Sequence, residues 1–248
     1  MTEILELYDS EVRANPASRP GLELVNDAHV TRLEGAFNFI CSWRFSNDTA
    51  PQAVSDQANH FRQIGEELMW RVYDHDEPSN LEACLEKEGF VPGPQGSLMV
   101  LPLAEGISTE SAHDIRRVTS PTGLRDHLKV AASAFGSVDG GDSDYLLQLL
   151  SEPGFLLFCG YSGDEPVVSG RLEMPSNSSF GILFGGGVTP SHRGKGFYRA
   201  MVNARASIAR EKGLKYLITE AREMSRPILE TLGFRTLARE RTWSLPRS

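Results

Sequence analysis

The sequence contains few cysteines and no long apolar run. Its three cysteines, Cys41, Cys84 and Cys159, are far apart and set in apolar surroundings. An odd, widely spaced set fits neither a disulfide framework nor a zinc site, so we expect reduced core thiols and no bound metal. No apolar stretch approaches the length of a membrane span, and four acidic residues within 1–13 argue against a signal or transit peptide. These absences favour a cytoplasmic protein that does not enter a membrane.

Basic residues are scarce in the first half of the chain. Residues 1–110 hold 19 acidic and 7 basic side chains, whereas residues 111–248 hold 14 and 18, within a net charge of −8. This asymmetry argues against nucleic acid as a partner of the whole chain. It suits a C-terminal half that binds a polyanionic cofactor, although the acidic half is equally consistent with a solvated face.

The most informative segment is 188–200, which reads VTPSHRGKGFYRA. A glycine-rich strand precedes it and an amphipathic helix follows, so free backbone N–H groups and a helix N-terminus converge on one point, as at phosphate sites. The segment does not match a Walker A loop, because Gly196 follows Lys195, nor a dinucleotide fingerprint, because Ala200 stands at the third glycine. The alternative is an ordinary strand-to-helix turn with a solvated basic face.

The C-terminal half alternates strands and helices. A proline at the first helical turn, a Gly-Asp-Glu-Pro hairpin turn at 163–166 and a basic last turn with a glycine at 213 mark the boundaries. The strands are expected at 115–118, 155–161, 167–174, 180–188, 214–219, 234–238 and 241–245, and the helices at 121–135, 144–150, 194–212 and 224–232. The order predicts a mixed, mostly antiparallel sheet flanked by helices, an α/β (α+β) fold. The glycines at 185–187 indicate a bulge or a close approach of a ligand.

The N-terminal half contains a weaker copy of this pattern. A strand is expected at 67–73, a helix at 78–88 and a strand at 98–103, and LEKEGF at 85–90 parallels LETLGF at 229–234. Nothing like Arg-Gly-x-Gly precedes residue 67, and chance similarity remains the alternative because helices often end in Gly-Phe. We therefore expect residues 1–105 to form a degenerate domain without a cofactor site, joined through 104–111 to a complete domain over 112–248.

These motifs together resemble the GNAT superfamily of acyl-CoA-dependent N-acyltransferases. Residues from about 114 to 245 carry the likeness: Arg193 and Gly196 match the family pattern Arg/Gln-x-x-Gly-x-Gly/Ala, and the chain later reads SRPILE before Leu-Gly-Phe. The resemblance implies a GNAT-like fold and acetyl-CoA as cosubstrate. Its cofactor contacts would come from a continuous loop and the strand before it: Gly187, Val188, Arg193, Gly194, Lys195, Gly196, Phe197, Tyr198 and Arg199.

The resemblance also implies direct attack of an amine on the thioester, where strands 180–188 and 214–219 diverge. Catalysis would be mainly positioning and oxyanion stabilisation, with a carboxylate receiving the amine proton, and Glu220 and Glu173 are the candidates. Leu229 stands where the family often has the tyrosine that protonates the leaving thiolate. Ser225, Tyr198 or solvent would replace that tyrosine.

The expected function is therefore transfer of an acetyl or other acyl group to an amine of a small molecule or an exposed peptide amine. The chain would act as a monomer or homodimer. The alternative is a catalytically weak acyl-CoA-binding module with a regulatory or structural role, which the missing tyrosine supports. A hydrolase is disfavoured because no Gly-x-Ser-x-Gly elbow occurs.

Overall fold

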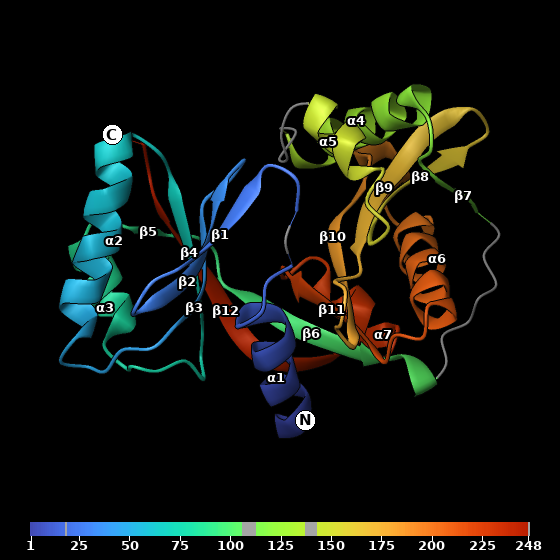
Figure 1. Cartoon of the computed structure of the whole chain (residues 1–248). Helices are drawn as coiled ribbons and strands as arrows, with labels where there is room; N and C mark the ends of the chain where they lie inside the picture. Colours follow the sequence, from blue (N-terminus) through green and yellow to red (C-terminus); the bar gives the residue numbers. More distant parts are fainter. Residues whose placement is uncertain (18, 106–112, 137–142, 248) are drawn as a thin grey trace. The chain divides into compact units, whose positions relative to one another are not determined.

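The computed structural model describes residues 1–17, 19–105, 113–136 and 143–247 (Figure 1). It divides into two compact units. The first unit comprises Met1–Leu98, Glu220–Glu223 and Thr236–Ser248, and the second comprises Met99–Thr219 and Met224–Arg235. Most of the linker expected at 104–111 lies outside the described residues.

The first unit contains a sheet in the order β1-β2-β3-β4-β12, with β5 paired to β12. Its strands are β1 (Leu22–Asn26), β2 (Val30–Gly35), β3 (Phe39–Trp43), β4 (Leu68–Tyr73), β5 (Val91–Pro92) and most of β12 (Arg235–Leu245). All of these pairs are antiparallel except β3 with β4, which are parallel. A parallel pair needs a crossover, and the helix between β3 and β4 supplies it.

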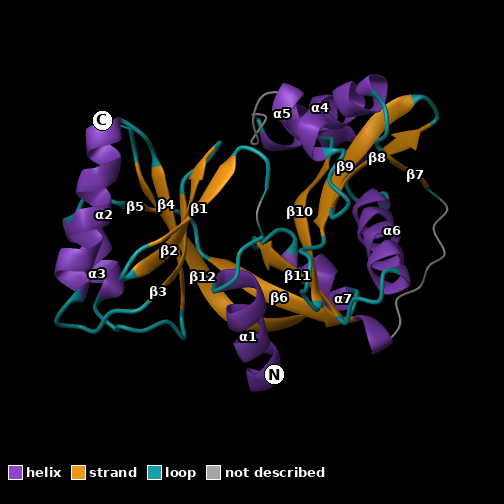
Figure 2. Cartoon of the chain, in the orientation of Figure 1, coloured by secondary structure: helices purple, strands orange, loops and turns teal. Residues whose placement is uncertain are grey.

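Two helices of the first unit pack side by side against this sheet (Figure 2). They are α2 (Ala50–Ile64) and α3 (Leu81–Lys87), and α1 (Thr2–Tyr8) continues into a π-helical turn at Asp9–Arg13. Phe61 and Leu85 are completely buried against Trp70 and its neighbours, so the apolar faces of both helices form one core with the sheet. Gly65 ends α2 in the left-handed conformation (φ = 70°), which an L side chain adopts rarely.

The second unit contains a sheet in the order β11-β10-β9-β8-β7. The strands are β7 (Asp114–Arg117), β8 (Phe155–Ser162), β9 (Glu165–Glu173), β10 (Phe180–Val188) and β11 (Tyr216–Ala221). Neighbours are antiparallel except β10 and β11, which are parallel. Strand β6 (Gly96–Pro102) holds residues of both units, as do β11 and β12.

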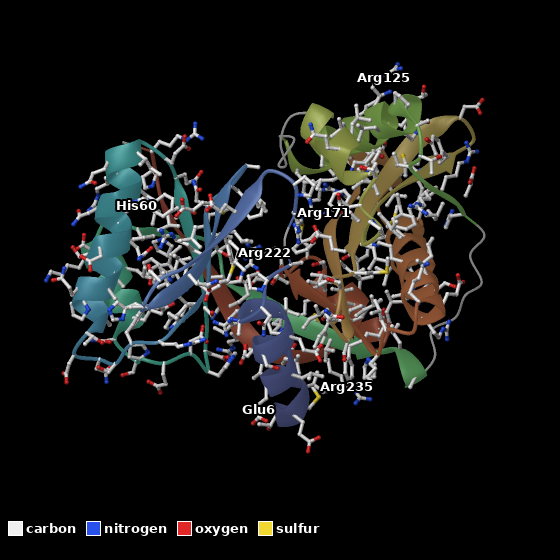
Figure 3. The ribbon with its side chains drawn as sticks, viewed as in Figure 1. Glu6, His60, Arg125, Arg171, Arg222 and Arg235 are labelled. Atoms are coloured by element: carbon white, nitrogen blue, oxygen red, sulfur yellow. The ribbon has the colours of Figure 1, made fainter. Side chains whose placement is uncertain are left out.

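Helices cover both faces of strands β8 to β10 (Figure 2). Helices α4 (Pro121–Phe135) and α5 (Ser143–Leu149) lie on one side, α6 (Phe197–Glu211) lies on the other, and α7 (Arg226–Thr231) follows β11. Glycines of the sheet lie close to the helices on both faces. A Cβ atom added to Gly187 would collide with Phe135 of α4, and one added to Gly170 would press on Met201 of α6. The exposed Arg125 of α4 points away from the sheet (Figure 3).

The mixed, mostly antiparallel sheet with flanking helices confirms the expected fold class, and most predicted elements match within a few residues. One prediction was wrong, because a single strand, β12, replaces the two strands expected at 234–238 and 241–245. No turn residue interrupts Leu237–Arg241, and β12 pairs with β4 continuously from Glu240 to Leu245. Helix α6 begins at Phe197 rather than at Gly194, because Gly194 and Gly196 have positive φ angles of 75° and 85°.

The three cysteines are buried and free, as the sequence predicted. Burial raises the pKa of the Cys41 thiol to about 12 and that of Cys159 to about 11, so both remain protonated. Among the described residues, no helix is long and apolar enough to cross a membrane. No group of three or more histidine, cysteine or acidic side chains in the described ranges could hold a metal ion.

Candidate functional site

The loop before α6 presents a continuous run of backbone donors. Residues 190–192 form a 3₁₀ turn, and the chain then reverses through Gly194 and Gly196 into α6. Ala200 makes the first helical hydrogen bond, to Gly196 O. No acceptor among the described residues is bound by the N–H groups of 194–199, and Gly196 caps the helix without a side chain. Such a loop at a positive helix end can hold a phosphate or pyrophosphate.

Most of the side chains of this loop are exposed, but some are held by hydrogen bonds and others are not. Arg193 donates to the carbonyls of Val188 and Ala134, and Arg199 donates to the Thr231 hydroxyl. Phe197 is buried, so it can offer a ligand only its backbone. Lys195 is exposed and has no partner in the described part of the chain. The charge around the loop is therefore partly fixed in place, not wholly mobile.

Two histidines border the loop through the Phe197 ring. The His113 ring lies 4.1 Å from the Phe197 centroid and the His192 ring lies 5.8 Å from it. A Cβ added to Gly196 would come within 3.1 Å of His113 Nε2. His192 is half-buried and bonds the hydroxyls of Thr189 and Ser191. Sequence reasoning missed His113, because it is far from the motif along the chain.

Strand β10 is irregular where a ligand would lie alongside it. Phe184 pairs with Arg171 and Gly187 pairs with Ser169, so β10 carries one more residue than β9 over this stretch. Gly185 adopts φ = 56°, which confirms the bulge expected from the three glycines. Pairing of β10 with β11 ends at Ile182 and Ile218, whereas β10 continues to Val188.

The two strands thus separate after Ile182, and the sequence analysis expected strands 180–188 and 214–219 to diverge. At the point of separation, the Thr219 hydroxyl donates to Leu183 O over 3.0 Å in a buried position. Beyond it, β9 is the single strand among the described residues that pairs with β10 near Gly187 and Val188. An extended ligand such as a pantetheine arm can add to that edge as a further strand would.

Tyr198 and Ser225 lie together beside the bulge. A Cβ added to Gly186 would come within 3.1 Å of the Tyr198 ring, so this tyrosine packs directly on the bulge. The Tyr198 hydroxyl is hydrogen-bonded to the Ser225 side chain, and burial raises the pKa of Tyr198 above its usual value of 10. Ser225 begins α7 without capping it through its side chain. Leu229 is 1% exposed and belongs to the core.

Glu173, one of the two candidate bases, is buried in the sheet. It lies between Phe155 and Ile182 on the neighbouring strands, and its Oε1 is 2.8 Å from Arg171 Nε. Arg171 on β9 (Figure 3) also lies over the rings of Phe155 and Phe184. With 4% of its side chain exposed and an arginine beside it, Glu173 has little access to solvent.

Glu220, the other candidate, is held within the first unit. Its Oε1 is 2.7 Å from Arg71 Nη1, and the Tyr73 hydroxyl donates to the same oxygen over 3.4 Å. Tyr8 in turn bonds Tyr73, with the two hydroxyls 2.9 Å apart. The side chain of Glu220 is 13% exposed, against 4% for Glu173. Arg71 and Tyr73, which sequence reasoning missed, orient this carboxylate from β4.

Comparison with solved structures gives the fold a name. A GCN5-related N-acetyltransferase from Kribbella flavida superposes with a TM-score of 0.73 at 15% identity, covering 92% of this chain and 91% of its own. A putative GNAT acetyltransferase from Novosphingobium aromaticivorans gives 0.61 at 13% identity, covering 91% of each chain. A tandem GNAT protein from the clavulanic acid biosynthesis pathway, without acetyl-CoA, gives 0.62 at 12%, covering 96% of this chain and 87% of its own.

The chain has the GNAT fold, and the similarity extends over both of its halves. This confirms the resemblance seen in the sequence at the level of the fold. No protein-family model and no curated protein matches the sequence. At 12–15% identity the neighbours define an architecture and leave the reaction to be argued from the residues of the site.

Proposed function

We propose that this protein transfers an acetyl group, or a related acyl group, from acetyl-CoA to an amine. One observation carries the proposal: three features follow one another within the second unit. They are the free N–H groups at 194–199, the bulge at Gly185–Gly187 and the separation of β10 from β11. A pyrophosphate on the loop and a pantetheine arm along β10 would bring a thioester to the point where the strands part.

The reaction is direct attack at that point. The amine nitrogen bonds the carbonyl carbon, the carbon–sulfur bond breaks, and the sulfur leaves with the bonding electron pair. The amine proton passes, directly or through water, to a carboxylate. Glu220 is the better candidate, because it is more exposed than Glu173 and lies beyond the last residue of β11 that pairs with β10. The Tyr198–Ser225 pair faces the leaving sulfur.

The acceptor is an amine of a small molecule or an exposed peptide amine. A panel of such amines with acetyl-CoA, followed by detection of released thiol, tests the proposal. Amine-dependent thiol release with acetylated product supports it, and saturating acetyl-CoA that neither binds nor turns over contradicts it.

A second function is an acyl-CoA-binding module with little turnover. It is favoured by Leu229, which is buried and aliphatic where the resemblance would place a proton donor. In that case acetyl-CoA raises the melting temperature, but no amine in the panel releases thiol. Binding and turnover measured on the same preparation therefore separate the two functions.

A further inference from the structure

Helix α6 carries a buried arginine whose charge no carboxylate neutralises. Arg205 is 1% exposed. Its Nε donates to Met201 O, and its Nη1 donates to Arg171 O and Phe184 O. It forms no ion pair with any acidic side chain in the described part of the chain. Carbonyl oxygens bind its N–H groups but leave a full positive charge inside the protein.

That charge is costly in isolation. Buried charges in proteins are normally paired, because a low-dielectric interior solvates an isolated ion poorly. Burial lowers the pKa of Arg205 to about 10, yet the guanidinium remains protonated at neutral pH. An arginine kept in such a place is stabilised when an anion arrives beside it.

The guanidinium lies directly behind the bulge of β10. Phe184, whose carbonyl it binds, is the last residue before the irregular stretch, and an added Cβ on Gly186 would be 3.3 Å from Arg205 Nη2. The same Cβ would be 3.1 Å from Tyr198. Arg205 and Tyr198 therefore converge on the stretch from Phe184 to Gly186, which follows the point where β10 parts from β11.

We propose that Arg205 is the counter-ion of the thiolate that leaves when the acyl group is transferred. The inference rests on the proposed function and adds how the leaving group is stabilised. The carbon–sulfur bond breaks, its electron pair stays on sulfur, and the resulting anion is paired with the guanidinium charge through the glycine bulge. The amine proton goes to the carboxylate, so no proton needs to reach the sulfur before it leaves.

The chemistry of Tyr198 supports this assignment. A thiol has an ordinary pKa of about 8.5, well below that of a phenol. Burial raises the pKa of Tyr198 further, so complete proton transfer from Tyr198 to a thiolate is unfavourable. Tyr198 can donate a hydrogen bond to the sulfur, while the charge itself requires a cation. The nearby Arg205 charge acts against burial and lowers the pKa of Tyr198.

The experiment compares three ligands of the intact protein across pH: CoA, acetyl-CoA and desulfo-CoA, which lacks the sulfur. If Arg205 stabilises the thiolate, bound CoA has a lower thiol pKa than free CoA, and its affinity rises with pH between those two values. The ratio of CoA to desulfo-CoA affinity should rise at least about tenfold, which corresponds to one pKa unit. The acetyl-CoA to desulfo-CoA ratio should stay flat.

Taking ratios removes the other titrating groups near Arg205. Tyr198 on the same helix and His127 from α4 are the ionisable groups that interact with its charge, and Arg171 on β9 contributes its carbonyl oxygen. Burial lowers the pKa of His127, which keeps it neutral over this range. Their effects on the rest of the ligand are shared by CoA and desulfo-CoA, so the ratio isolates the contribution of the sulfur.

Variants separate charge from packing. Arg205→Gln should flatten the CoA ratio and lower the single-turnover rate by about 10²–10³-fold, the range for losing one stabilising group at a developing anion. Arg205→Lys should retain the rise, although it cannot make the same three backbone contacts. Arg210→Gln, at an exposed position on the same helix, is the matched control and should behave as the parent protein.

The outcomes are distinct. A flat CoA ratio in the unmutated protein overturns the inference even if the Gln variant does not fold. A Lys variant that loses the rise as completely as Gln, while it still binds acetyl-CoA, also overturns it and assigns Arg205 to bracing the bulge. Acetyl-CoA that fails to bind the unmutated protein instead rejects the proposed function.

Discussion

The two units contain the same local arrangement, but among the described residues only the second has a glycine-rich loop of unbound N–H groups before its helix. In the first unit, parallel strands β3 and β4 are joined by α2, and in the second, parallel strands β10 and β11 are joined by α6. Both helices have 15 residues. The second strand of each parallel pair is followed by a short helix, α3 after β4 and α7 after β11. The structure therefore supports a repeat beyond the shared Gly-Phe helix ends, and extends it to β3 and α2.

Even the irregularities of the strands recur. Strand β3 carries an extra residue opposite Thr31–Arg32, at Cys41, as β10 does at Gly185–Gly186. Pairing of β3 with β4 ends at Ile40 and Trp70, so these strands also separate before they end. The bulge and the separation thus persist in the unit that lacks the glycine-rich loop.

The helix starts are where the units differ. Before α2, the Thr49 and Ala50 N–H groups both donate to Ser46 O, and the Thr49 hydroxyl accepts from Ser46 N. Pro51 has no N–H to offer. Before α6, two left-handed glycines leave the corresponding donors unused. An anion can be held at α6, whereas at α2 the chain satisfies its own donors.

The space between the separating strands of the first unit is filled by its own side chains. The Arg13 guanidinium lies 5.2 Å from the Trp43 ring on β3 and 4.5 Å from the Tyr73 ring on β4. It also forms a two-pronged contact with Asp76 at 2.8 and 2.9 Å. In the first unit side chains bridge the separating strands, whereas in the second unit β10 continues beyond its last pair with β11. Four experiments test this contrast between the units.

The largest effect is expected at the candidate base. Glu220→Gln should lower the single-turnover acetylation rate by about 10²–10⁴-fold, with acetyl-CoA binding little changed, because a positioned base is lost. Activity should also fall as the pH is lowered, because a smaller fraction of the acceptor amine is then unprotonated. Glu173→Gln is the matched variant, and its effect should be smaller. A double variant that keeps the parent rate at every pH would remove both residues from the mechanism.

The next largest effect is expected on stability, when the side-chain contacts between the separating strands of the first unit are removed. Arg13→Ala removes the guanidinium that pairs with Asp76, whose side chain is 8% exposed, and losing one member of a buried pair costs about 3–5 kcal/mol. The loss is measured by urea unfolding followed through tryptophan fluorescence. All three tryptophans, Trp43, Trp70 and Trp243, are in the first unit. Arg62→Ala, at a more exposed ion pair, should cost about 0–1 kcal/mol; equal losses would contradict the comparison.

The open edge of the second unit should respond to ligand. Acetyl-CoA at 100 times its dissociation constant should stabilise the protein by about 2.7 kcal/mol, and Gly196→Asp or Arg193→Glu should abolish the gain. Gly213→Asp is the matched control for Gly196→Asp, since it puts the same charge on a left-handed glycine at the other end of α6. Strands β6, β11 and β12 hold residues of both units. The unfolding midpoint followed by tryptophan fluorescence in the first unit should therefore shift together with that of the second unit. Two independent transitions would show that the units unfold separately.

The smallest effect is a pH dependence confined to the first unit. The hydrogen bond to Asp9 raises the pKa of His75, and His75 and Arg13 together lower the pKa of Asp9 despite the opposing effect of burial. The pair's contribution is therefore fully present between about pH 4 and 6.5, the unfolded values. It is lost above this window as His75 deprotonates and below it as Asp9 is protonated. His75→Gln should remove about 0.2–1 kcal/mol within the window and nothing at pH 9, by urea unfolding.

The sequence predicted the second unit more completely than the first. Helix α4 and strand β10 occupy the predicted residues, because proline, glycine and apolar periodicity define their ends locally. The sequence predicted no helix or strand before β4. The correspondence of β3 and α2 with β10 and α6 became recognisable only from the strand pairing. Register and parallel pairing depend on residues far apart in the chain, so local patterns do not encode them.

The candidate site divides in the same way. Gly194 and Gly196 could be assigned from sequence, because a left-handed backbone beside a helix start is a local requirement. The partners of Glu220 and the position of Arg205 could not, since Arg71 comes 149 residues before Glu220 and a buried arginine in a helix resembles a surface one in sequence. Whether Glu220 or Glu173 is accessible also depended on neighbouring strands. The sequence alone determined the backbone that can hold a phosphate, and the tertiary structure decided which charges are buried beside it, because burial and pairing arise only when distant segments pack together.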